Sequence, residues 1–254
     1  MSRGRYELRL AATEAEIVQA QQLRHLAFWT ARGRVRADGL DCDVFDAAAQ
    51  HMLVWDRVTK DLVACCRIFP CDGTTLSQSY AAQFYDLARL SGFPGPMLEL
   101  GRFCLHPDRH DPDILRLIWA GLTRKVDADG IALLFGCSSF TGADPARHAA
   151  ALALLARHAA PAMWRPAALA PHWVSLADAR ADGDSPPHAL LRAEGLSQMP
   201  ALLRSYLSMG GWVSDHAVID SQLDTLHVLT GVEIAAIPAA RARALRLVAS
   251  ENMG

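Results

Sequence analysis

The sequence predicts a mixed α/β domain, and three observations lead to this fold class. Of its 254 residues 51% are hydrophobic and 20% are charged, which supplies a sizeable core and excludes a disordered chain. Apolar segments of strand length alternate with segments of helical periodicity. Residues 131–138 are almost wholly apolar, as in a strand covered on both faces. We expect a single domain over residues 1–254, with a core at about 10–160 and a carboxy-terminal elaboration at about 188–250.

The first predicted elements are a helix and a hairpin. Thr13 and Glu16 form a capping box, in which Thr13 accepts from the third helical N–H group and Glu16 reaches back. The helix that follows should end before Gly33. Residues 51–56 and 62–69 are rich in β-forming side chains and are separated by a polar turn, which predicts a β-hairpin.

The middle of the chain predicts two helices around a strand. Residues 80–90 are interpreted as a short helix, and residues 97–105 as a third strand. Asp111 and Pro112 supply an N-cap and a first-turn proline for a longer helix, which Gly130 ends. The apolar strand at 131–138 comes next.

The last third of the chain continues the α/β pattern. The elements expected there are a helix at 144–158, a connector at 159–187, a helix at 200–209, strands at 212–218 and 225–232, and a final helix from Pro238. No internal repeat interrupts this order. One mixed domain with a carboxy-terminal elaboration therefore accounts for the whole sequence.

Charge and composition narrow the classes of partner and location. The net charge of −2 excludes a generic polyanion-binding surface, so we expect no nucleic-acid partner. The amino terminus has no apolar signal region, and no apolar run is long enough to cross a membrane. The six cysteines follow no disulfide-framework spacing. These features favour a cytoplasmic protein.

A metal site is the first chemistry to consider. Cys104, His106 and His110 are residue types that zinc accepts. Pro107 places a turn at the end of the strand, however, so the three side chains need not converge, and a surface turn with one buried cysteine is the simpler interpretation. The common hydrolase, metalloprotease and nucleotide-binding motifs are missing. We expect no metal and no resident cofactor.

Charged residues interrupt apolar segments in an unusual way. Arg67 lies in one predicted strand, and Glu99 and Arg102 lie in another. Residues three apart in a strand point to opposite faces, so Glu99 and Arg102 need different partners unless a bulge intervenes. Further charges of this kind are Arg24 and the loop residues Asp41, Asp43 and Asp46. Buried charges are costly unless they are paired, so the pattern indicates a structural ion network or a polar pocket.

These residues also carry a family resemblance. The pattern Arg24-xxx-Phe28, Asp43-xx-Asp46, Arg67 and Glu99-xx-Arg102-Phe103 resembles acyl-homoserine-lactone synthases, which are GNAT-like N-acyltransferases. The resemblance is closer to the L-ornithine Nα-acyltransferases of bacterial ornithine-lipid synthesis. The blocks that match this group are Glu99-Leu-Gly-Arg-Phe-Cys-Leu-His-Pro107, Ile118-Trp-Ala-Gly-Leu122 and Leu134-Phe-Gly-Cys-Ser-Ser-Phe-x-Gly142, with further similarity at 202–211 and 217–220.

The resemblance implies a fold and an activity. The fold is the GNAT-like N-acyltransferase fold, with a mixed central sheet splayed between two parallel strands, here 97–105 and 131–138, and helices on both faces. The activity is transfer of a (3-hydroxy)acyl group from acyl carrier protein to the α-amine of L-ornithine. The product would be lyso-ornithine lipid, made in the first step of ornithine-lipid biosynthesis. A lipid product further implies brief contact with the inner membrane surface.

The resemblance and the chemistry of acyl transfer suggest roles for individual residues. Glu99 is expected to take the amine proton, because burial in an apolar strand can raise the pKa of a carboxyl group toward neutrality. Simple ion pairing of Glu99 with an arginine is the alternative. The residues expected to be catalytic are Glu99 and Arg102. Those expected to bind the acceptor are Arg24, Phe28, Asp43, Asp46 and Arg67. Those expected to bind the acyl chain or the pantetheine arm are Phe103, Cys104, Ser138 and Ser139.

The loop after the third strand favours a carrier-protein donor over CoA. Residues 106–113 contain no glycine, two prolines without N–H groups and three aspartates, which are unsuited to binding a pyrophosphate. A carrier protein needs to insert only its phosphopantetheine arm. Because carrier proteins are acidic, their docking site should be rich in arginine. Candidate surfaces are Arg32, Arg34 and Arg36, or Arg124, Lys125 and Arg147.

Two other functions remain open at this point. One is an acyl-homoserine-lactone synthase that uses S-adenosylmethionine as acceptor. The other is a non-catalytic protein that binds an acyl carrier or an amino acid without releasing a free thiol.

Overall fold

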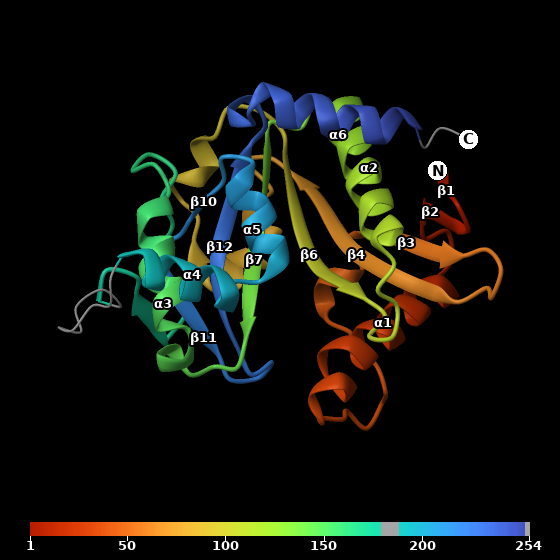
Figure 1. Ribbon diagram of the computed structural model, residues 1–254, viewed down its shortest axis with the longest axis horizontal. Helices are drawn as coiled ribbons and strands as arrows, with labels where there is room; N and C mark the ends of the chain where they lie inside the picture. Colours follow the sequence, from red (N-terminus) through yellow and green to blue (C-terminus); the bar gives the residue numbers. More distant parts are fainter. Residues whose placement is uncertain (179–187, 252–254) are drawn as a thin grey trace. The chain divides into compact units, whose positions relative to one another are not determined.

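The computed structural model describes residues 1–178 and 188–251 (Figure 1). The chain forms two compact units. Unit 1 consists of Met1–Pro70, Leu98–Ile131 and Ala239–Gly254. Unit 2 consists of Cys71–Met97 and Ala132–Pro238. The final helix belongs to the same unit as the amino-terminal strands. The expected single domain, with its core and carboxy-terminal elaboration, stays a prediction.

Unit 1 is built on a sheet whose strands follow the order β1-β2-β3-β4-β6. These strands are β1 (Ser2–Arg3), β2 (Tyr6–Leu10), β3 (Gln50–Asp56), β4 (Leu62–Cys71) and β6 (Met97–Leu105). The pairs from β1 to β4 are antiparallel, and Leu53 in β3 lies opposite Cys65 in β4. The predicted hairpin and third strand are confirmed, whereas β1 and β2 were not predicted.

Helices cover both faces of this sheet. On one face α1 (Glu14–Phe28) packs through Ala20 and Leu23 against Leu53 and Cys65. On the other face α2 (Pro112–Asp129) lies so close that a Cβ on Gly121 would be 2.8 Å from Leu8 Cδ2. The last helix, α6 (Ala239–Glu251), packs against α2 (Figure 1). Arg246 of α6 pairs there with Asp127 of α2.

The local signals for both long helices are confirmed. Thr13 Oγ1 accepts a hydrogen bond from the Glu16 N–H group at 3.3 Å. Asp111 caps α2 through the Asp113 N–H group at 2.9 Å. Gly130 ends α2 in the left-handed region, with φ +61°, a conformation that favours glycine.

Unit 2 contains a second set of antiparallel strands in the order β7-β12-β11-β9, with β10 paired to β12. They are β7 (Leu133–Thr141), β9 (Trp173–Ser175), β10 (Trp212–Val213), β11 (His216–Asp220) and β12 (Thr225–Glu233). The short strands β5 (Tyr85–Asp86) and β8 (Ala167–Ala168) form a separate pair. The predicted carboxy-terminal strands are thereby confirmed.

The hydrophobic core of unit 2 lies between helices and one face of these strands. Residues from α3 (Ala149–Leu155) and α5 (Ala201–Ser208) pack against Leu226 and Val228 of β12. A further helix, α4 (His188–Gln198), packs against α3. The sequence did not predict α4.

Short 3₁₀ helices occur in the connections. They are η1 (Thr30–Arg32), η2 (Val44–Asp46), η3 (Leu76–Gln78), η4 (Ala81–Gln83), η5 (Leu90–Gly92), η6 (Pro145–His148), η7 (Ala156–His158) and η9 (Ile234–Ala236).

Two predicted helices differ from the structure. The prediction of a helix at residues 80–90 is wrong: this segment forms η4, β5 and the start of η5, because Tyr85 is buried and its hydroxyl bonds to His227. The helix predicted at 144–158 is α-helical only within α3, with 3₁₀ turns on either side. The connector predicted at 159–187 contains β8 and β9, and its residues 179–187 lie outside the described part of the chain.

Within residues 1–178 and 188–251, no helix is long and apolar enough to cross a membrane. The mixed α/β class with helices on both faces of a sheet is confirmed.

Candidate active site

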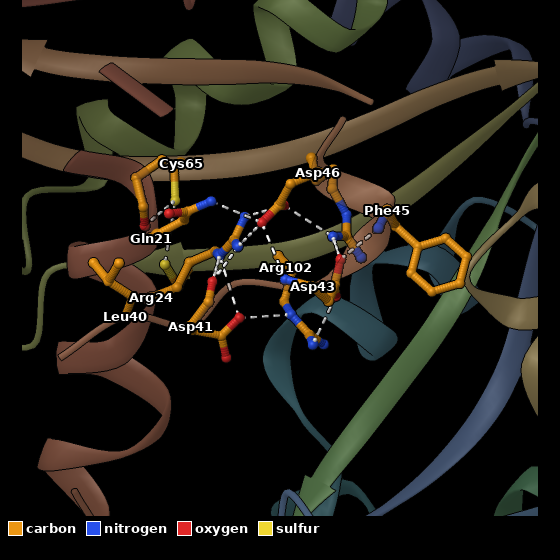
Figure 2. Close-up of polar contacts among 12 residues, drawn as sticks. Gln21, Arg24, Leu40, Asp41, Asp43, Phe45, Asp46, Cys65 and Arg102 are labelled. Atoms are coloured by element: carbon orange, nitrogen blue, oxygen red, sulfur yellow. Dashed lines mark hydrogen bonds and ion pairs between the residues drawn. The ribbon is translucent and has the colours of Figure 1, made fainter. Parts of the chain in front are cut away.

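A network of buried ions forms in unit 1, on the sheet face that α1 covers (Figure 2). Its arginines come from three separate elements: Arg24 from α1, Arg67 from β4 and Arg102 from β6. Its carboxylates come from one loop and are Asp41, Asp43 and Asp46. The structure therefore brings together the charges that interrupt the apolar segments of the sequence.

The loop holds its carboxylates in place through local hydrogen bonds. Asp43 is the N-cap of η2, and its Oδ1 accepts from the Phe45 N–H group at 3.0 Å. The Asp43 N–H group in turn donates to Asp46 Oδ2 at 3.3 Å. This capping box is formed by two aspartates, and it directs both carboxylates toward the arginines.

The centre of the network is the pair between Arg24 and Asp46. Arg24 Nη1 and Nη2 donate to the two Asp46 oxygens at 2.9 and 2.8 Å, in a bidentate arrangement. Arg24 Nε donates to the Asp41 carbonyl at 3.0 Å, and Nη2 also contacts that carbonyl. The Arg24 side chain is 1% exposed. All three guanidinium nitrogens are engaged within the protein.

Burial and pairing act against each other on these groups. Burial alone would raise the pKa of Asp46, but hydrogen bonds and charges from Arg24 and Arg67 outweigh it and hold the pKa well below its ordinary value. Burial alone would lower the pKa of Arg24, and Asp46 and Asp41 reverse this effect. Burial lowers the pKa of His51, whose imidazole is therefore neutral at physiological pH and donates through Nε2 to the Asp46 carbonyl at 3.1 Å.

Asp43 connects the buried centre to a more accessible edge. Arg67 Nη1 contacts Asp43 Oδ1 and lies 3.0 Å from Asp46 Oδ1. Arg102 Nη2 donates to Asp43 Oδ2 at 3.1 Å, and its Nε donates to Asp41 Oδ1 at 3.0 Å. The side chains of Asp43 and Arg102 are 19% and 13% exposed, against 4% for Arg67. The Asp43–Arg102 edge is therefore the more exposed part of the network.

The backbone of β6 is irregular where it meets the network. Arg102 has φ +49°, a left-handed conformation that costs a non-glycine residue about 1–2 kcal/mol. A Cβ on the preceding Gly101 would lie 3.9 Å from Arg67 Nε, so two successive residues are directed toward the same face. Such an irregularity has the effect of a β-bulge. Alternation then assigns Glu99, two residues before Gly101, to this face as well.

This irregularity answers a question that the sequence left open. Glu99 and Arg102 are three residues apart, and in a regular strand they would face opposite sides of the sheet. Glu99 is buried, at 5% exposure, and has interactions of its own. The buried carboxyl of Glu99 and the edge of the network therefore belong to one face of unit 1.

The other expected residues of unit 1 lie around this network. Phe28, the last residue of α1, is half-buried and packs against the hydrophobic cluster that contains Leu23 and Cys65. Cys104 is buried, with its Sγ 3.5 Å from Cys65 Sγ, and Phe103 is half-buried on β6. The roles expected for these residues stay predictions.

Ser138 and Ser139 lie on β7 in unit 2. Ser138 is buried, and its Oγ accepts a hydrogen bond from Thr230 Oγ1 at 2.9 Å. Ser139 is exposed and lies opposite His227 of β12. Only Ser139 therefore presents its side chain to solvent, and the role expected for each serine stays a prediction.

Three residues complete the network without having been predicted as part of the site. Trp29 Nε1 donates to Asp41 Oδ2 at 3.0 Å, and Gln21 Nε2 donates to Asp46 Oδ2 at 3.0 Å. His51 is the third. Gln21 lies three residues before Arg24 on α1, and His51 lies two residues before Leu53 on β3, so helical and strand periodicity are the signals that point to them.

The candidate metal ligands do not converge. Cys104 faces Cys65, His106 Nδ1 accepts from the Asp108 N–H group at 3.2 Å, and His110 is exposed. Throughout the described part of the chain, no three histidine, cysteine or carboxylate side chains are grouped so as to hold a metal ion.

The chain is similar to known acyltransferases. The model of the acetyltransferase (GNAT) domain family matches residues 23–120, which span most of the network and agree with the predicted fold class. An L-ornithine Nα-acyltransferase of Brucella abortus is 32% identical over 240 residues, covering 89% of this chain and 83% of that protein. One from Rhodobacter capsulatus is 32% identical over 236 residues, covering 88% of each.

Among solved structures, a CoA-dependent acyl-homoserine lactone synthase with SAM and isopentyl-CoA is similar at 14% identity. The match covers 93% of this chain and 83% of that chain, with a TM-score of 0.49.

Proposed function

The chain belongs to the L-ornithine Nα-acyltransferases. We propose that it transfers an acyl group, which can be a 3-hydroxyacyl group, from acyl carrier protein to the α-amine of L-ornithine. The product is lyso-ornithine lipid, and the reaction is the first step of ornithine-lipid biosynthesis. The observation that carries the proposal is 32% identity over 240 residues, which cover 89% of this chain and 83% of the relative. The alternative acceptor, S-adenosylmethionine, is a matter for experiment.

The charge balance of the network suits ornithine as acceptor. The three arginines are matched by Asp41, Asp43 and Asp46, and Glu99 adds a further carboxyl group on the same face. A site with excess negative charge favours a substrate with a second ammonium group. We place the ornithine δ-ammonium beside Asp43 and the ornithine carboxylate beside Arg102 or Arg67, at the exposed edge of the network.

Arg24 is then a positioning residue. Each of its nitrogens already donates to Asp46 or to the Asp41 carbonyl, and its side chain is almost inaccessible. Through Asp46 it also fixes the capping box that orients Asp43. Its replacement should therefore change the acceptor site indirectly.

The reaction needs a neutral amine and a polarised thioester. The α-amine nitrogen attacks the carbonyl carbon, the carbon–sulfur bond breaks, and the thiol of the phosphopantetheine arm leaves. Because an α-amine is largely protonated near neutral pH, Glu99 is assigned to take its proton, directly or through water. Glu99 releases that proton to solvent, and the second proton, which the nitrogen loses after its attack, passes to the departing thiolate. A backbone N–H group near Phe103 and Cys104 is assigned to the developing oxyanion.

The start of α2 supports a carrier-protein donor. A pyrophosphate binds to free N–H groups at a helix N-terminus. Here Pro112 has no N–H group, the Asp113 N–H group donates to Asp111 Oδ1 at 2.9 Å, and the Ile114 N–H group donates to the Asp111 carbonyl at 3.2 Å. The carboxylates of Asp111 and Asp113 add negative charge there. CoA therefore lacks its usual phosphate site, whereas a carrier protein does not need one.

One assay tests donor and acceptor together. Free thiol release would be measured with acyl carrier protein thioester and L-ornithine, with S-adenosylmethionine in place of ornithine, and with acyl-CoA in place of the carrier. We expect turnover with ornithine and a kcat/KM at least about tenfold lower for acyl-CoA, equivalent to ~1.4 kcal/mol. Turnover with S-adenosylmethionine alone identifies a lactone synthase, and ligand binding without thiol release identifies a non-catalytic protein.

The role of Glu99 needs its own variant. Glu99→Gln should lower kcat by ~10²–10⁴ and remove the acidic limb of the pH–rate profile, while circular dichroism shows a folded protein. Glu14→Gln, in the exposed first turn of α1, is the matched control and should leave kcat unchanged. If Glu99→Gln unfolds the protein, or if its effect disappears in an Arg102→Ala background, Glu99 is a structural partner.

The product also bears on location. An acylated ornithine is amphipathic, so we propose that the protein contacts the membrane surface briefly to release it. Flotation with phosphatidylglycerol vesicles, with and without product formation, tests this contact, and equal recovery in the soluble fraction under both conditions would contradict it.

A further inference from the structure

Unit 2 carries an apolar segment at its surface. Residues 145–177 contain no aspartate or glutamate, and this is the longest stretch of the sequence without an acidic residue. Its later part, residues 161–173, includes Met163, Leu169 and Trp173, whose exposed fractions are 63%, 58% and 48%. Apolar side chains scattered singly over a surface are ordinary, whereas a contiguous patch of them marks an interaction surface.

Contacts around His216 connect the position of Met163 with that of Trp173. The turn that carries Met163 is closed by Arg165, whose Nε and Nη2 donate to the carbonyl at the start of the turn at 3.2 and 3.1 Å. Arg165 Nη1 also lies 3.9 Å from Asp215 Oδ2, and Asp215 Oδ1 is 2.8 Å from His216 Nδ1. Trp173 packs edge-on against the same imidazole, with ring centroids 5.6 Å apart. The turn and Trp173 therefore both contact the Asp215–His216 pair.

Leu169 is connected to His216 by a different route, through the polar cluster of Tyr85, His216 and His227. The Leu169 N–H group donates to the Phe84 carbonyl at 3.2 Å. The next residue, Tyr85, packs against His216 with ring centroids 5.3 Å apart and against His227 at 5.7 Å. All three exposed apolar side chains thus project from supports that share one buried imidazole. They form the apolar patch of unit 2.

The charges at the border of the patch cancel. Arg89 is exposed, and its Nη1 donates to the carbonyl of the residue before Met163 at 3.1 Å. Arg165 pairs with Asp215, and the exposed Asp86 lies in β5, the strand paired with β8. Two arginines are thus balanced by two carboxylates. An acidic carrier protein needs an excess of positive charge for docking, so it is not the partner that this surface fits.

The patch is also small for an interface between proteins. A stable interface buries about 800 Å² on each partner and uses about 20–30 residues of each. Here three large apolar side chains are exposed, and the edge strand beside them, β9, has three residues. A second copy of the chain therefore finds too little surface. A lipid bilayer sets no such minimum, because each side chain that enters it contributes separately.

Trp173 gives the patch a feature that suits the surface of a bilayer. A tryptophan ring is apolar but carries a polar N–H group, and this side chain is enriched at the level of lipid headgroups. All six tryptophans lie in the described part of the chain, and Trp173 alone among them is exposed. The most amphipathic of the large side chains is therefore exposed only at this patch.

We propose that the apolar patch of unit 2 binds the surface of a phospholipid bilayer, with Met163, Leu169 and Trp173 entering between the headgroups. The inference rests on the proposed function, because a lipid product gives the protein a reason to bind a bilayer. Three partly exposed side chains provide weak and reversible binding, which lets the protein leave the bilayer after it delivers its product.

The first test measures the affinity of the full chain for vesicles of phosphatidylethanolamine and phosphatidylglycerol by co-sedimentation, without substrates. The double variant Met163→Ser/Leu169→Ser should bind at least about tenfold more weakly than the wild type. Both side chains are exposed, so circular dichroism should show a folded protein. Leu247→Ser is the matched control, since Leu247 is 60% exposed on α6 of unit 1, and it should bind as the wild type does.

The source of the binding energy is tested by salt. Because the charges at the border cancel, raising the salt concentration from about 0.1 to about 0.5 M should weaken vesicle binding less than the double variant does. A loss of binding with salt that exceeds the loss in the double variant would show an electrostatic contact and overturn the proposal.

The second test observes the contact directly. Vesicles of brominated lipids quench tryptophan fluorescence only at short range, so they should quench the wild type, and Trp173→Phe should lose the greater part of this quenching. Trp55→Phe is the control, because Trp55 is half-buried in β3 of unit 1 and its replacement should leave the quenching in place. Equal quenching of the wild type and Trp173→Phe contradicts the proposal.

The remaining outcomes separate this proposal from the proposed function. Thiol release from soluble substrates should be the same in the wild type and the double variant, because the patch is not part of the charge network. If the wild type does not bind vesicles, or the double variant binds them equally well, the proposal is wrong. It is also wrong if the double variant instead changes the sedimentation coefficient in lipid-free buffer or the affinity for acyl carrier protein. If vesicle binding behaves as expected but no thiol is released, it is the proposed function that fails.

Discussion

Unit 1 and unit 2 both bury polar side chains against a sheet, but they stabilise these groups by different means. In unit 1 the buried groups are ions, and each is matched by opposite charge, as in the pair of Arg24 with Asp46. In unit 2 the buried groups are neutral, as with His227, and some of their hydrogen-bonding atoms lack a partner among the described residues. A paired ion network fixes a geometry before any ligand arrives, whereas an unsatisfied neutral acceptor leaves a hydrogen bond for a ligand to make.

The largest effect should come from removing the shared carboxylate of the ion network. Asp46→Ala leaves Arg24 and Arg67 buried without their common partner, and should lower the free energy of unfolding by about 3–5 kcal/mol. Urea unfolding followed by circular dichroism measures this loss. Asp38→Asn is the control on the same loop, since its exposed carboxylate pairs with Arg36, and it should give no measurable change. A similar small effect for both variants would show that the pairing in unit 1 contributes little.

The next effect concerns the accessible edge of the network. Asp43→Asn should lower kcat/KM for ornithine by the equivalent of about 2–5 kcal/mol and reduce the preference for ornithine over uncharged amino acids, because one charged partner of the acceptor is lost. Steady-state kinetics with both acceptors measure it. An unchanged preference in a folded Asp43→Asn protein assigns Asp43 to the structural network alone.

Acidification should destabilise the buried groups of the two units over different ranges of pH, and His227 of unit 2 should respond first. His227 has a pKa of about 4 in the folded protein and ~6.5 when unfolded, so the unfolded state binds the extra proton between these values. Stability should therefore fall by ~3 kcal/mol from about pH 6.5 to pH 4 through this group. The His227→Phe variant should lack that part of the decline.

Asp46 responds over a lower range of pH. The pKa of Asp46 is depressed in the folded protein, so the carboxylate makes its full contribution to the free energy of unfolding above the pKa of the unfolded state, ~3.9. This contribution is lost only as the pH falls further. Unfolding free energies of wild type and His227→Phe between pH 7 and pH 4 distinguish the two groups. Parallel curves for the two proteins would contradict the neutral burial of His227.

The same contrast explains what the sequence predicts well and what it does not. Charges within apolar strands are visible in the sequence, and the ion network contains Arg24, Arg67 and Arg102 as expected. The left-handed backbone at Arg102 is not visible, because the residue is not a glycine. Alternation alone would have placed Glu99 on the other face.

Long-range contacts account for the failures in the fold. Residues 80–90 have helical periodicity, but Tyr85 bonds to His227, which is 142 residues away in the sequence, and this segment is extended there. Conversely, capping residues such as Thr13 and Asp111 act over three residues or fewer, and the helices that they predict are confirmed. Local signals define the ends of helices, whereas the polar cluster of unit 2 depends on contacts that no local pattern specifies.

The smallest expected effect comes from a hydrogen bond between two buried neutral side chains of unit 2. In unit 2, Thr230 Oγ1 donates to Ser138 Oγ at 2.9 Å, and both residues are buried. Thr230→Val should cost about 1 kcal/mol, because the Ser138 hydroxyl loses its donor, and Ser138→Ala should cost a similar amount. The double variant should be more stable than the sum of the single effects predicts, since it leaves no buried hydroxyl unsatisfied. Urea unfolding of the four proteins measures the coupling, and strictly additive losses would mean that the two hydroxyls contribute independently.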